Sequence, residues 1–345
     1  MRKLATLRKI KSLTPIKGAD RIELATVDGW SVVVEKGLHN EGDTVVYCEI
    51  DSFLPIREEF EFLRKSSYRK LSDGTEGFRL RTIRLRGQIS QGLILPINIL
   101  GEDAKLKYNG SNTGLSVTEL LGITKWEQAI PPQLLGIMEP WPSSVSRTDE
   151  ERIQNFDYDE LRSKNLKWYV TEKLDGTSCT MLKEVENEFK VCGRNYEIVE
   201  GDNTYWQVTK KYEVRNTLKD LFQRGMKIAI QGEIIGPGIQ SNIYKLNEHQ
   251  FRVFNMYDIQ KGQYICKEQV DLICRKHNLL QVPVIEREFE LPETLDELLR
   301  YTDGNSVLNP ETAREGFVFV SRDEDGRRIS FKVISNTFLV NEEYE

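Results

Sequence analysis

The chain has 345 residues and a formal net charge of −6, with 30% charged and 39% apolar residues. This length exceeds one small core and predicts two domains, one of about a hundred residues and one of about two hundred. No uncharged apolar run approaches the roughly 18 residues of a membrane span, and the amino terminus lacks a signal pattern. We therefore expect an intracellular, cytoplasmic protein without membrane association.

Cysteine and histidine do not point to a metal or disulfide framework. The five cysteines are scattered and odd in number, and none forms a Cys-x-x-Cys pair or a Cys/His cluster with zinc spacing. The three histidines, His39, His249 and His277, are far from other candidate ligands in the sequence. Reduced thiols are expected, and histidine chemistry is not.

Positive charge is concentrated in residues 1–21 and 64–86. The second segment contains Arg64, Lys65, Arg69, Lys70, Arg79, Arg81, Arg84 and Arg86, against Asp73 and Glu76. Nucleic acid is held by local basic patches that displace counterions, so this segment predicts nucleic-acid binding despite the negative total charge. A charged face that contacts only solvent is the structural alternative.

Short β segments separated by glycine-bearing turns fill the first hundred residues. They are expected at Leu4–Ile10, Arg21–Val27, Trp30–Glu35, Asp43–Glu49, Phe78–Arg86 and Gly92–Pro96. Within Phe78–Arg86 the apolar positions step from Leu80 to Ile83, which breaks the alternation of a strand and predicts a bulge or bend. We expect a small β-barrel that turns a corner there.

Four prolines lie between residues 128 and 147, namely Pro131, Pro132, Pro140 and Pro142. Neither a continuous helix nor a central strand tolerates this density, so it predicts a linker over 128–147. Immediately afterwards, Thr148 and Glu151 have the spacing of a capping box. That spacing predicts a helix beginning at Thr148.

Strands dominate again from Leu166 onward, with helices between them. The expected strands are Leu166–Lys173, Ser178–Glu184, Glu188–Arg194, Lys227–Ile234, Phe251–Ile259, Glu315–Ser321 and Arg328–Ile334. The expected helices are Asp202–Arg224, Lys267–His277 and Pro292–Arg300. This mixture predicts an α+β fold class.

The segment W-Y-V-T-E-K-L-D-G-T-S, residues 168–178, brings a lysine and a carboxylate to the end of an apolar strand. Lys173 and Asp175 emerge there, and Gly176 permits a sharp turn. A nucleophilic lysine must be neutral, yet its unperturbed pKa is about 10.4. A neighbouring positive charge, a metal or desolvation would have to lower that pKa. K-x-D-G is short, and a surface Lys–Asp pair is its structural alternative.

Polar and aromatic candidates follow at the ends of later strands. Arg194 and Asn195 end the segment V-C-G-R-N and suit phosphate and ribose oxygens. Phe254, in F-R-V-F-N-M-Y-D, offers a flat apolar surface for a purine. A salt bridge for Arg194 and core packing for Phe254 are the structural alternatives.

Charged residues complete the series. Glu233 lies before the tight turn of G-E-I-I-G-P-G, Glu315 begins E-G-F-V-F-V, and Lys332 lies within S-F-K-V-I-S. Each has an apolar strand context. The two glutamates could instead pair with Arg194 or Lys332, and such pairing could coexist with catalysis.

Taken in chain order, these segments resemble the motifs of the covalent nucleotidyltransferase superfamily, which contains DNA ligases, RNA ligases and mRNA capping enzymes. The matching positions are Lys173-Leu174-Asp175-Gly176, Gly193-Arg194-Asn195, Phe254, Glu315-Gly316 and Lys332. The resemblance extends from about Thr148 to the end of the sequence. It implies that Lys173 carries a nucleotide as a covalent intermediate.

Two segments are similar to ATP-dependent RNA ligases of family 5, namely T-D-E-E-R-I-Q-N at 148–155 and G-E-I-I-G-P-G-I-Q-S-N-I-Y at 232–244. That family carries an OB-type domain before its catalytic domain. The segments A-D-R-I-E-L-A-T-V-D-G-W and G-D-T-V-V-Y-C-E-I-D resemble OB domains that bind tRNA in some synthetases. The resemblance implies an OB-like nucleic-acid-binding domain with a connecting segment over 1–127 and a nucleotidyltransferase domain of antiparallel sheets and flanking helices over 148–345.

The resemblance also implies the ligands. ATP, the AMP donor, would bind through Lys173, Asp175, Gly176, Arg194, Asn195, Glu233, Phe254, Glu315 and Lys332. Mg²⁺ or Mn²⁺ would be held by Asp175, Glu233 and Glu315, directly or through water. Several RNA ligases have two lysines one residue apart in the fifth motif, but Ser330 occupies the first place here. Lys332 alone is therefore expected at the phosphates, and Lys173 and Lys332 are the expected catalytic residues.

The implied reaction joins RNA 3′-OH and 5′-phosphate ends in nicked or bridged duplexes, including RNA/DNA hybrids, and we expect a monomer. Two alternatives stay open. A capping-type guanylyltransferase would use the same lysine with GTP, although its OB domain usually follows the catalytic domain. A non-catalytic RNA-binding protein would use only the basic barrel.

Overall fold

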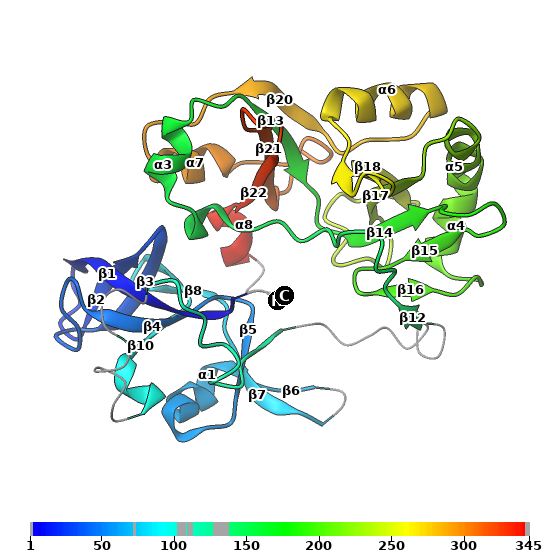
Figure 1. Ribbon diagram of the computed structural model, residues 1–345. Helices are drawn as coiled ribbons and strands as arrows, with labels where there is room; N and C mark the ends of the chain where they lie inside the picture. Colours follow the sequence, from blue (N-terminus) through cyan, green and yellow to red (C-terminus); the bar gives the residue numbers. More distant parts are fainter. Residues whose placement is uncertain (1–2, 72–73, 102–107, 109–112, 127–137, 342–345) are drawn as a thin grey trace. The chain divides into compact units, whose positions relative to one another are not determined.

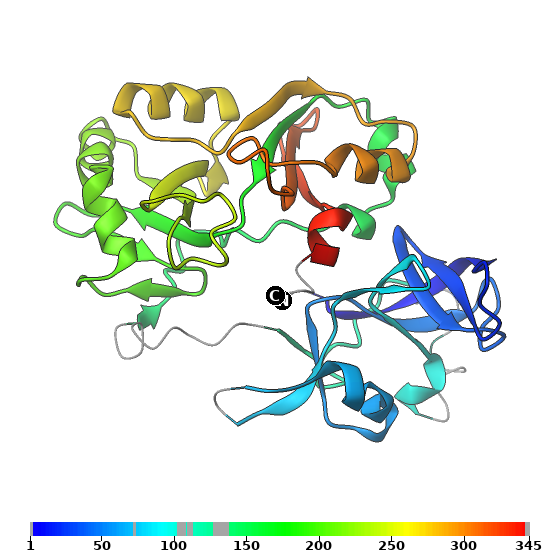
Figure 2. The same cartoon turned by 180° about the vertical axis from the view of Figure 1, so that it is seen from behind.

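The structure is a computed structural model that describes residues 3–71, 74–101, 108, 113–126 and 138–341. The chain forms two compact units, seen from opposite sides in Figures 1 and 2. Unit 1 comprises the described residues within 1–129, 154–158 and 339–345, and unit 2 comprises those within 130–153 and 159–338. Half of the expected linker 128–147 lies outside the described residues, so the domain boundaries stay a prediction.

Unit 1 consists mainly of antiparallel strands. One sheet has the order β10-β4-β1-β2-β3, a second has the order β11-β5-β7-β6, and β8 and β9 form a hairpin. The strands are β1 (Ala5–Pro15), β2 (Ile22–Val27), β3 (Trp30–Glu35), β4 (Thr44–Cys48), β5 (Ser52–Pro55), β6 (Tyr68–Lys70), β7 (Glu76–Arg79), β8 (Thr82–Leu85), β9 (Gln88–Gln91), β10 (Leu93–Pro96) and β11 (Thr124–Lys125). Short helical segments are η1 (Glu58–Leu63), α1 (Arg64–Ser67) and η2 (Ile97–Leu100).

The long strand β1 bends the first sheet of unit 1. Its first half, Ala5–Lys9, pairs with β4, whereas its second half pairs with β2, and the register shifts between Ile10 and Ser12. Such an irregularity increases twist and curvature. Side chains that point inward from the two halves fill separate clusters, one around Leu7 and Phe78 and one around Trp30.

The expected bend within Phe78–Arg86 is confirmed, and it is sharper than a bulge. The segment splits into β7, which ends at Arg79, and β8, which begins at Thr82, and these strands belong to different sheets. Leu80 donates its backbone N–H to Ser52 O at 2.9 Å and accepts a hydrogen bond from Asp51 N at 3.0 Å. The chain therefore changes sheets at the step where the apolar alternation breaks.

Unit 2 contains two antiparallel sheets (Figure 1). The larger has the order β12-β16-β15-β14-β17-β18-β19, and the smaller has the order β20-β13-β21-β22. The strands are β12 (Met138–Pro140), β13 (Trp168–Lys173), β14 (Thr177–Leu182), β15 (Lys190–Cys192), β16 (Tyr196–Ile198), β17 (Ile228–Ile235), β18 (Gln250–Asp258), β19 (Gln263–Tyr264), β20 (Val284–Phe289), β21 (Gly316–Arg322) and β22 (Arg328–Ile334).

Helices α4, α5 and α6 bury apolar faces against the larger sheet of unit 2. The helical segments are η5 (Ile153–Asn155), α3 (Tyr158–Ser163), α4 (Thr204–Lys211), α5 (Val214–Gln223), α6 (Lys267–His277), α7 (Leu295–Thr302) and α8 (Asn336–Asn341). Leu218, Leu221 and Val270 meet Ile230 and Phe251 of the sheet in one core. Burial of these side chains stabilises the unit by about 1.5–3 kcal/mol each. No helix in the described ranges is long and apolar enough to cross a membrane.

The expected helix Asp202–Arg224 is two helices. Asn203 caps α4 by accepting the backbone N–H of Trp206, and the chain then breaks at Glu213, whose φ is +49°. A left-handed residue cannot continue an α-helix. Both helices contribute buried side chains to the same core, which a single continuous helix over Asp202–Arg224 did not anticipate.

The expected helix at Thr148 is wrong, because no helix begins there. Residues 148–151 have no regular secondary structure, and Lys332 N donates to Glu151 O at 2.8 Å. Glu150 forms an ion pair with Arg328 and accepts a hydrogen bond from Ser330 Oγ at 2.5 Å. The carboxylates of this segment thus bind side chains of β22, and those long-range bonds override the local capping signal.

Phe254 is the extra residue of a β-bulge in β18. The register of β17 against β18 skips one residue between Val253 and Asn255, which leaves Phe254 outside the ladder. Lys267 Nζ donates to Phe254 O at 2.5 Å and to Asn255 Oδ1 at 2.8 Å. The lysine at the start of α6 therefore holds the bulged backbone in place.

Lys267 is 9% exposed. Desolvation lowers its pKa to about 7, Arg328 acts in the same direction, and Glu150 and Asp271 oppose the change. A neutral amine still donates two hydrogen bonds, which matches the two oxygens that Lys267 contacts. The bulge therefore keeps its donor whether or not the lysine is charged.

Replacing Lys267 by methionine should change the pH dependence of stability. The unfolded chain holds one more proton than the folded chain between the folded-state pKa and the ordinary lysine pKa of about 10.4. The free energy of unfolding of the unsubstituted protein should therefore rise by up to about 1.4 kcal/mol per pH unit from this group, relative to Lys267→Met. Urea unfolding at several pH values above neutrality measures both slopes.

The exposed substitution Lys219→Met is the control, and its slope should equal that of the unsubstituted chain. Lys267→Met should also lose about 1–3 kcal/mol at neutral pH, because two buried oxygens lose their donor. Equal pH slopes in the Lys267→Met and unsubstituted proteins would contradict the assigned shift.

Candidate active site

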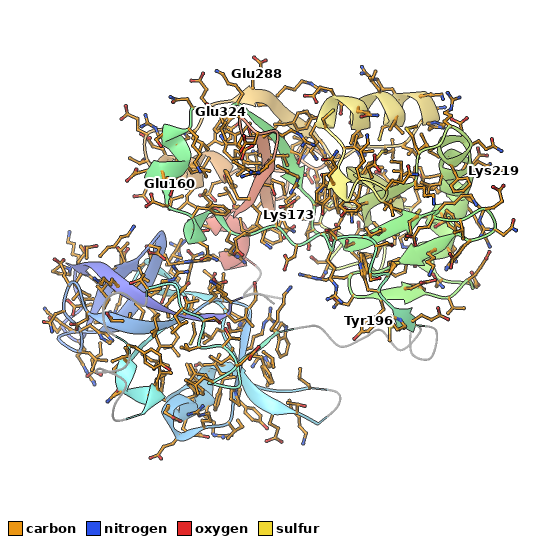
Figure 3. The ribbon with its side chains drawn as sticks, viewed as in Figure 1. Glu160, Lys173, Tyr196, Lys219, Glu288 and Glu324 are labelled. Atoms are coloured by element: carbon orange, nitrogen blue, oxygen red, sulfur yellow. The ribbon has the colours of Figure 1, made fainter. Side chains whose placement is uncertain are left out.

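Lys173 lies where the chain passes from one sheet of unit 2 to the other. It ends β13 of the smaller sheet, and Thr177 begins β14 of the larger sheet (Figure 3). Only Leu174, Asp175 and Gly176 connect the two strands. A Cβ at Gly176 would lie 2.4 Å from Ile234 O, which is closer than atoms can approach. The passage therefore requires glycine at this position.

Glu315 is the direct partner of Lys173. Lys173 pairs with Gly316 in the ladder of β13 and β21, and this register sets Glu315 beside the lysine. Nζ of Lys173 donates to Oε1 of Glu315 at 2.5 Å, and both side chains are largely buried. Desolvation works to lower the pKa of Lys173, but the charges of Glu315 and Glu233 outweigh it and raise that pKa above its ordinary value.

Glu233 and Asp175 lie close to this pair. Desolvation raises the pKa of Glu233 to about 8, while the positive charge of Lys173 acts in the opposite direction and Glu315 and Asp175 add to the rise. The backbone N–H of Asp175 donates to the hydroxyl of Tyr244 at 2.7 Å. Three carboxylates and one lysine thus share a single electrostatic environment.

Lys332 and Arg194 are joined through Asp149. Lys332 Nζ donates to Asp149 Oδ1 at 2.9 Å, and Arg194 lies 3.8 Å from Asp149 Oδ2. Lys332 is 8% exposed, whereas the Arg194 side chain is 55% exposed. One carboxylate therefore contacts a buried cation and an exposed cation. Ser330, in the place of a lysine, instead donates to Glu150.

Phe254 packs beside the lysine-bearing crossover. Its ring contacts the cluster of Leu174, Ile235 and Tyr244, so it is partly buried next to the segment that follows Lys173. Asn195 and Arg194 lie in the turn between β15 and β16. The expected residues thus come from six strands or their ends, namely β13, β15, β17, β18, β21 and β22.

The carboxylates around Lys173 leave one oxygen atom open for a metal ion. Oε2 of Glu315 is buried and has no hydrogen-bond partner among the described residues, so one hard oxygen is available. Among the residues that the structure describes, no three Asp, Glu, His or Cys side chains lie close enough together to hold a metal ion without other ligands. Mg²⁺ is usually held by one or two carboxylates plus substrate phosphates and water, and the site fits that mode.

Three residues that hold the site residues in place were not predicted from the sequence. Asp149 lay in a segment expected to be helical, Tyr244 lay in a motif whose tyrosine had no assigned contact, and Lys267 lay in a helix with an ordinary amphipathic pattern. A lysine at a helix start, directly after Ile265 and Cys266, was the one usable signal for Lys267. The partners of Asp149 and Tyr244 are too distant in the sequence for local patterns.

Family models match both units. A family described as an OB-fold domain matches residues 4–97, and a family described as RNA ligase matches residues 166–334. A search of curated proteins gives no match. The matches confirm the expected α+β fold class, with an OB-fold domain ahead of a sheet-rich nucleotidyltransferase domain.

Solved structures of an RNA ligase from Naegleria gruberi are similar over the full chain. The structure with PPi has 39% identity and a TM-score of 0.88, covering 100% of both chains. A glutamate-to-alanine mutant with ATP and Mn has the same identity, coverage and TM-score. A lysine-to-methionine mutant with AMP and Mn has 40% identity and a TM-score of 0.87, covering 98% of both chains.

The similarity to this RNA ligase covers the whole chain, including both segments that the family models match. The RNA ligase match over residues 166–334 includes Lys173 and Glu315. The chain therefore belongs to the RNA ligase family and is a ligase enzyme with an amino-terminal OB-fold domain.

Proposed function

We propose that this enzyme is an ATP-dependent RNA ligase that carries AMP on Lys173. The observation that supports the proposal most strongly is the Lys173–Glu315 pair at the crossover between two sheets. A lysine held at 2.5 Å from a carboxylate in a partly buried site is ordered but protonated. Nucleophilic attack requires that it lose this proton.

In the first step, Nζ of Lys173 forms a bond to the α-phosphorus of ATP, and the bond from that phosphorus to the bridging oxygen breaks to release pyrophosphate. One proton leaves the Lys173 ammonium before the attack, and a second leaves the nitrogen as its bond to phosphorus forms. Both protons pass to solvent water, and the product is a neutral phosphoramidate nitrogen. Catalysis of such displacements depends mostly on positioning and charge neutralisation. The Glu315 contact supplies the positioning.

Phosphate charge would be met by Lys332 and Arg194. Asp149 orients both cations, and the low exposure of Lys332 favours a fixed direction. Phe254, held on its bulge by Lys267, would cover the purine, and Asn195 would contact the ribose. Gly176 would face the nucleotide through its backbone, because its close approach to Ile234 O fixes the path of the crossover.

Asp175, Glu233 and Glu315 would hold Mg²⁺ or Mn²⁺ directly or through water, with phosphate oxygens completing the coordination. When bound, the ion would neutralise phosphate charge and favour the neutral form of the nearby lysine. The open Oε2 atom of Glu315 and the partly buried Glu233 support this assignment. The solved relatives that contain Mn are consistent with it.

The remaining steps would use nucleic acid. An RNA 5′-phosphate oxygen would attack the AMP phosphorus, break its bond to Lys173 and form a 5′–5′ pyrophosphate linkage. A 3′-OH would then attack the RNA phosphorus, lose its proton and release AMP. We propose nicked or bridged duplexes as substrates, including RNA/DNA hybrids, and a monomeric, cytoplasmic enzyme that acts in RNA repair.

Lys173→Ala should abolish covalent nucleotide transfer. The unsubstituted chain, incubated with divalent metal and α-labelled ATP and then denatured, should retain label, because Lys173 supplies the only proposed nucleophile. Lys167→Ala is a matched control, since Lys167 is an exposed lysine of the same unit in a surface ion pair with Glu290. Its label should equal that of the unsubstituted chain.

The same assay with α-labelled GTP separates the alternatives. Label from GTP in place of ATP would support a capping-type guanylyltransferase, and label from neither would support a non-catalytic RNA-binding role. Equal ATP label in Lys173→Ala and the unsubstituted chain would refute the assigned nucleophile.

Lys332→Met should slow formation of the lysyl-AMP intermediate on the order of 10²-fold, because the transition state loses a preorganised cation. Lys332→Arg should recover part of this rate, since it keeps the charge beside Asp149. Lys261→Met, which removes an exposed lysine paired with Asp258, is the control. Single-turnover rates with matched melting temperatures measure the effect, and an unchanged rate in Lys332→Met would remove this residue from the phosphate site.

A further inference from the structure

The basic segment 64–86 is not one uniform patch. Arg64 pairs with Glu61 and Lys70 pairs with Glu76, so part of its charge is neutralised within unit 1. The guanidinium of Arg79 lies 4.8 Å from the ring centroid of Trp126. These three side chains have roles inside the domain.

Three more arginines of the segment lie in or next to the β8–β9 hairpin, whose strand β8 is labelled in Figure 1. Arg81, Arg84 and Arg86 make no ion pair or hydrogen bond to any residue that the structure describes. Arg84 and Arg86 are exposed. Arginines without carboxylate partners keep their full attraction for an external anion.

The hairpin has a fixed base and an exposed tip. Thr82, Ser90 and Gln91 are at most 4% exposed, and Ser90 Oγ accepts the backbone N–H of Val33 at 3.0 Å. Every residue from 83 to 88 is exposed. The turn itself is tight, because Arg86 and Gly87 both have positive φ, at +49° and +82°. The tip therefore projects from an anchored base.

Aliphatic and basic side chains alternate along the tip. Ile83 and Leu85 are 40% and 39% exposed, and the register pairs Arg84 with Ile89 on the other strand. Because strand side chains alternate, Ile83 and Leu85 lie on one face of β8 and Arg84 lies on the other. A hairpin with these two faces suits a partner that offers both anionic and apolar surface. The sugar-phosphate backbone of nucleic acid offers both, as phosphate oxygens and ribose faces.

We propose that the β8–β9 hairpin binds the sugar-phosphate backbone of the RNA duplex that the enzyme seals, with Arg84 and Arg86 on phosphates and Ile83 and Leu85 against riboses. This inference rests on the proposed duplex substrate. It assigns RNA contact to one hairpin of the OB-fold domain, and not to the whole basic segment. The paired residues Arg64 and Lys70 contribute little to it.

The test compares two double substitutions in the full chain. Arg84→Ala/Arg86→Ala removes two unpaired cations from the hairpin, and Arg64→Ala/Lys70→Ala removes two paired cations from the same unit. The measurement is binding to a nicked RNA duplex over a range of salt concentrations. Each lost phosphate contact lowers the slope of log K against log salt by about 0.9, so the hairpin variant should lose about 1.8 and the control far less.

Lysyl-AMP formation without RNA separates this inference from the proposed function. It should be unchanged in both variants, because the exposed tip carries no active-site residue. A smaller salt slope with intact adenylylation supports the hairpin, whereas an unchanged slope with intact adenylylation overturns it and leaves the ligase mechanism standing. If the unsubstituted protein formed no lysyl-AMP, the proposed ATP-dependent mechanism would be refuted instead.

Ile83→Ser/Leu85→Ser tests the apolar contact separately. These exposed side chains do not support the core, so the fold should persist, as circular dichroism would verify. Affinity for the nicked duplex should fall several-fold while the salt slope stays constant. Unchanged affinity would remove the aliphatic residues from the interface.

Discussion

The site depends on the crossover of Lys173 to Thr177 between two sheets. Only three residues span it, and the close approach of Gly176 to Ile234 O fixes its path. Because β13 pairs with β21 on one side and β14 pairs with β17 on the other, this passage brings Glu315 and Glu233 to the same lysine. A single short connection therefore assembles groups that are far apart in the sequence.

The negative charges of Glu315 and Glu233 hold Lys173 in place, and they also keep it protonated and therefore unreactive. Glu315 and Glu233 hold the pKa of Lys173 high, so the lysine is an ammonium ion in this arrangement. Positive charge brought by the nucleotide's metal would compete for the same carboxylates and favour loss of the proton. Asp149 has the corresponding role for Lys332 and Arg194, because it keeps two cations oriented without a ligand.

Much of this could be predicted from the sequence. Strong local periodicity identified β3 and α6 with their observed bounds, and the broken alternation after Leu80 identified the change of sheets. Ordered motifs singled out Lys173, Glu315 and Lys332, and the structure pairs Lys173 with Glu315 and Lys332 with Asp149. Their roles in the reaction stay a prediction. Local patterns failed where distant bonds decide the structure. Asp149 and Glu150 bind β22 and prevent the helix that the spacing of Thr148 and Glu151 predicts. The bulge at Phe254 and its support by Lys267 likewise depend on pairing between strands and a later helix.

The most direct measurement of the central claim is the location of the covalent nucleotide. After reaction with ATP and divalent metal, the protein would be digested and its peptides examined by mass spectrometry under conditions that preserve phosphoramidates. We predict one AMP adduct, on the peptide that contains Lys173 and on the nitrogen of that lysine. An adduct on Lys267, on Lys332 or on any other residue, or no adduct in an enzyme that still seals RNA, would contradict the account.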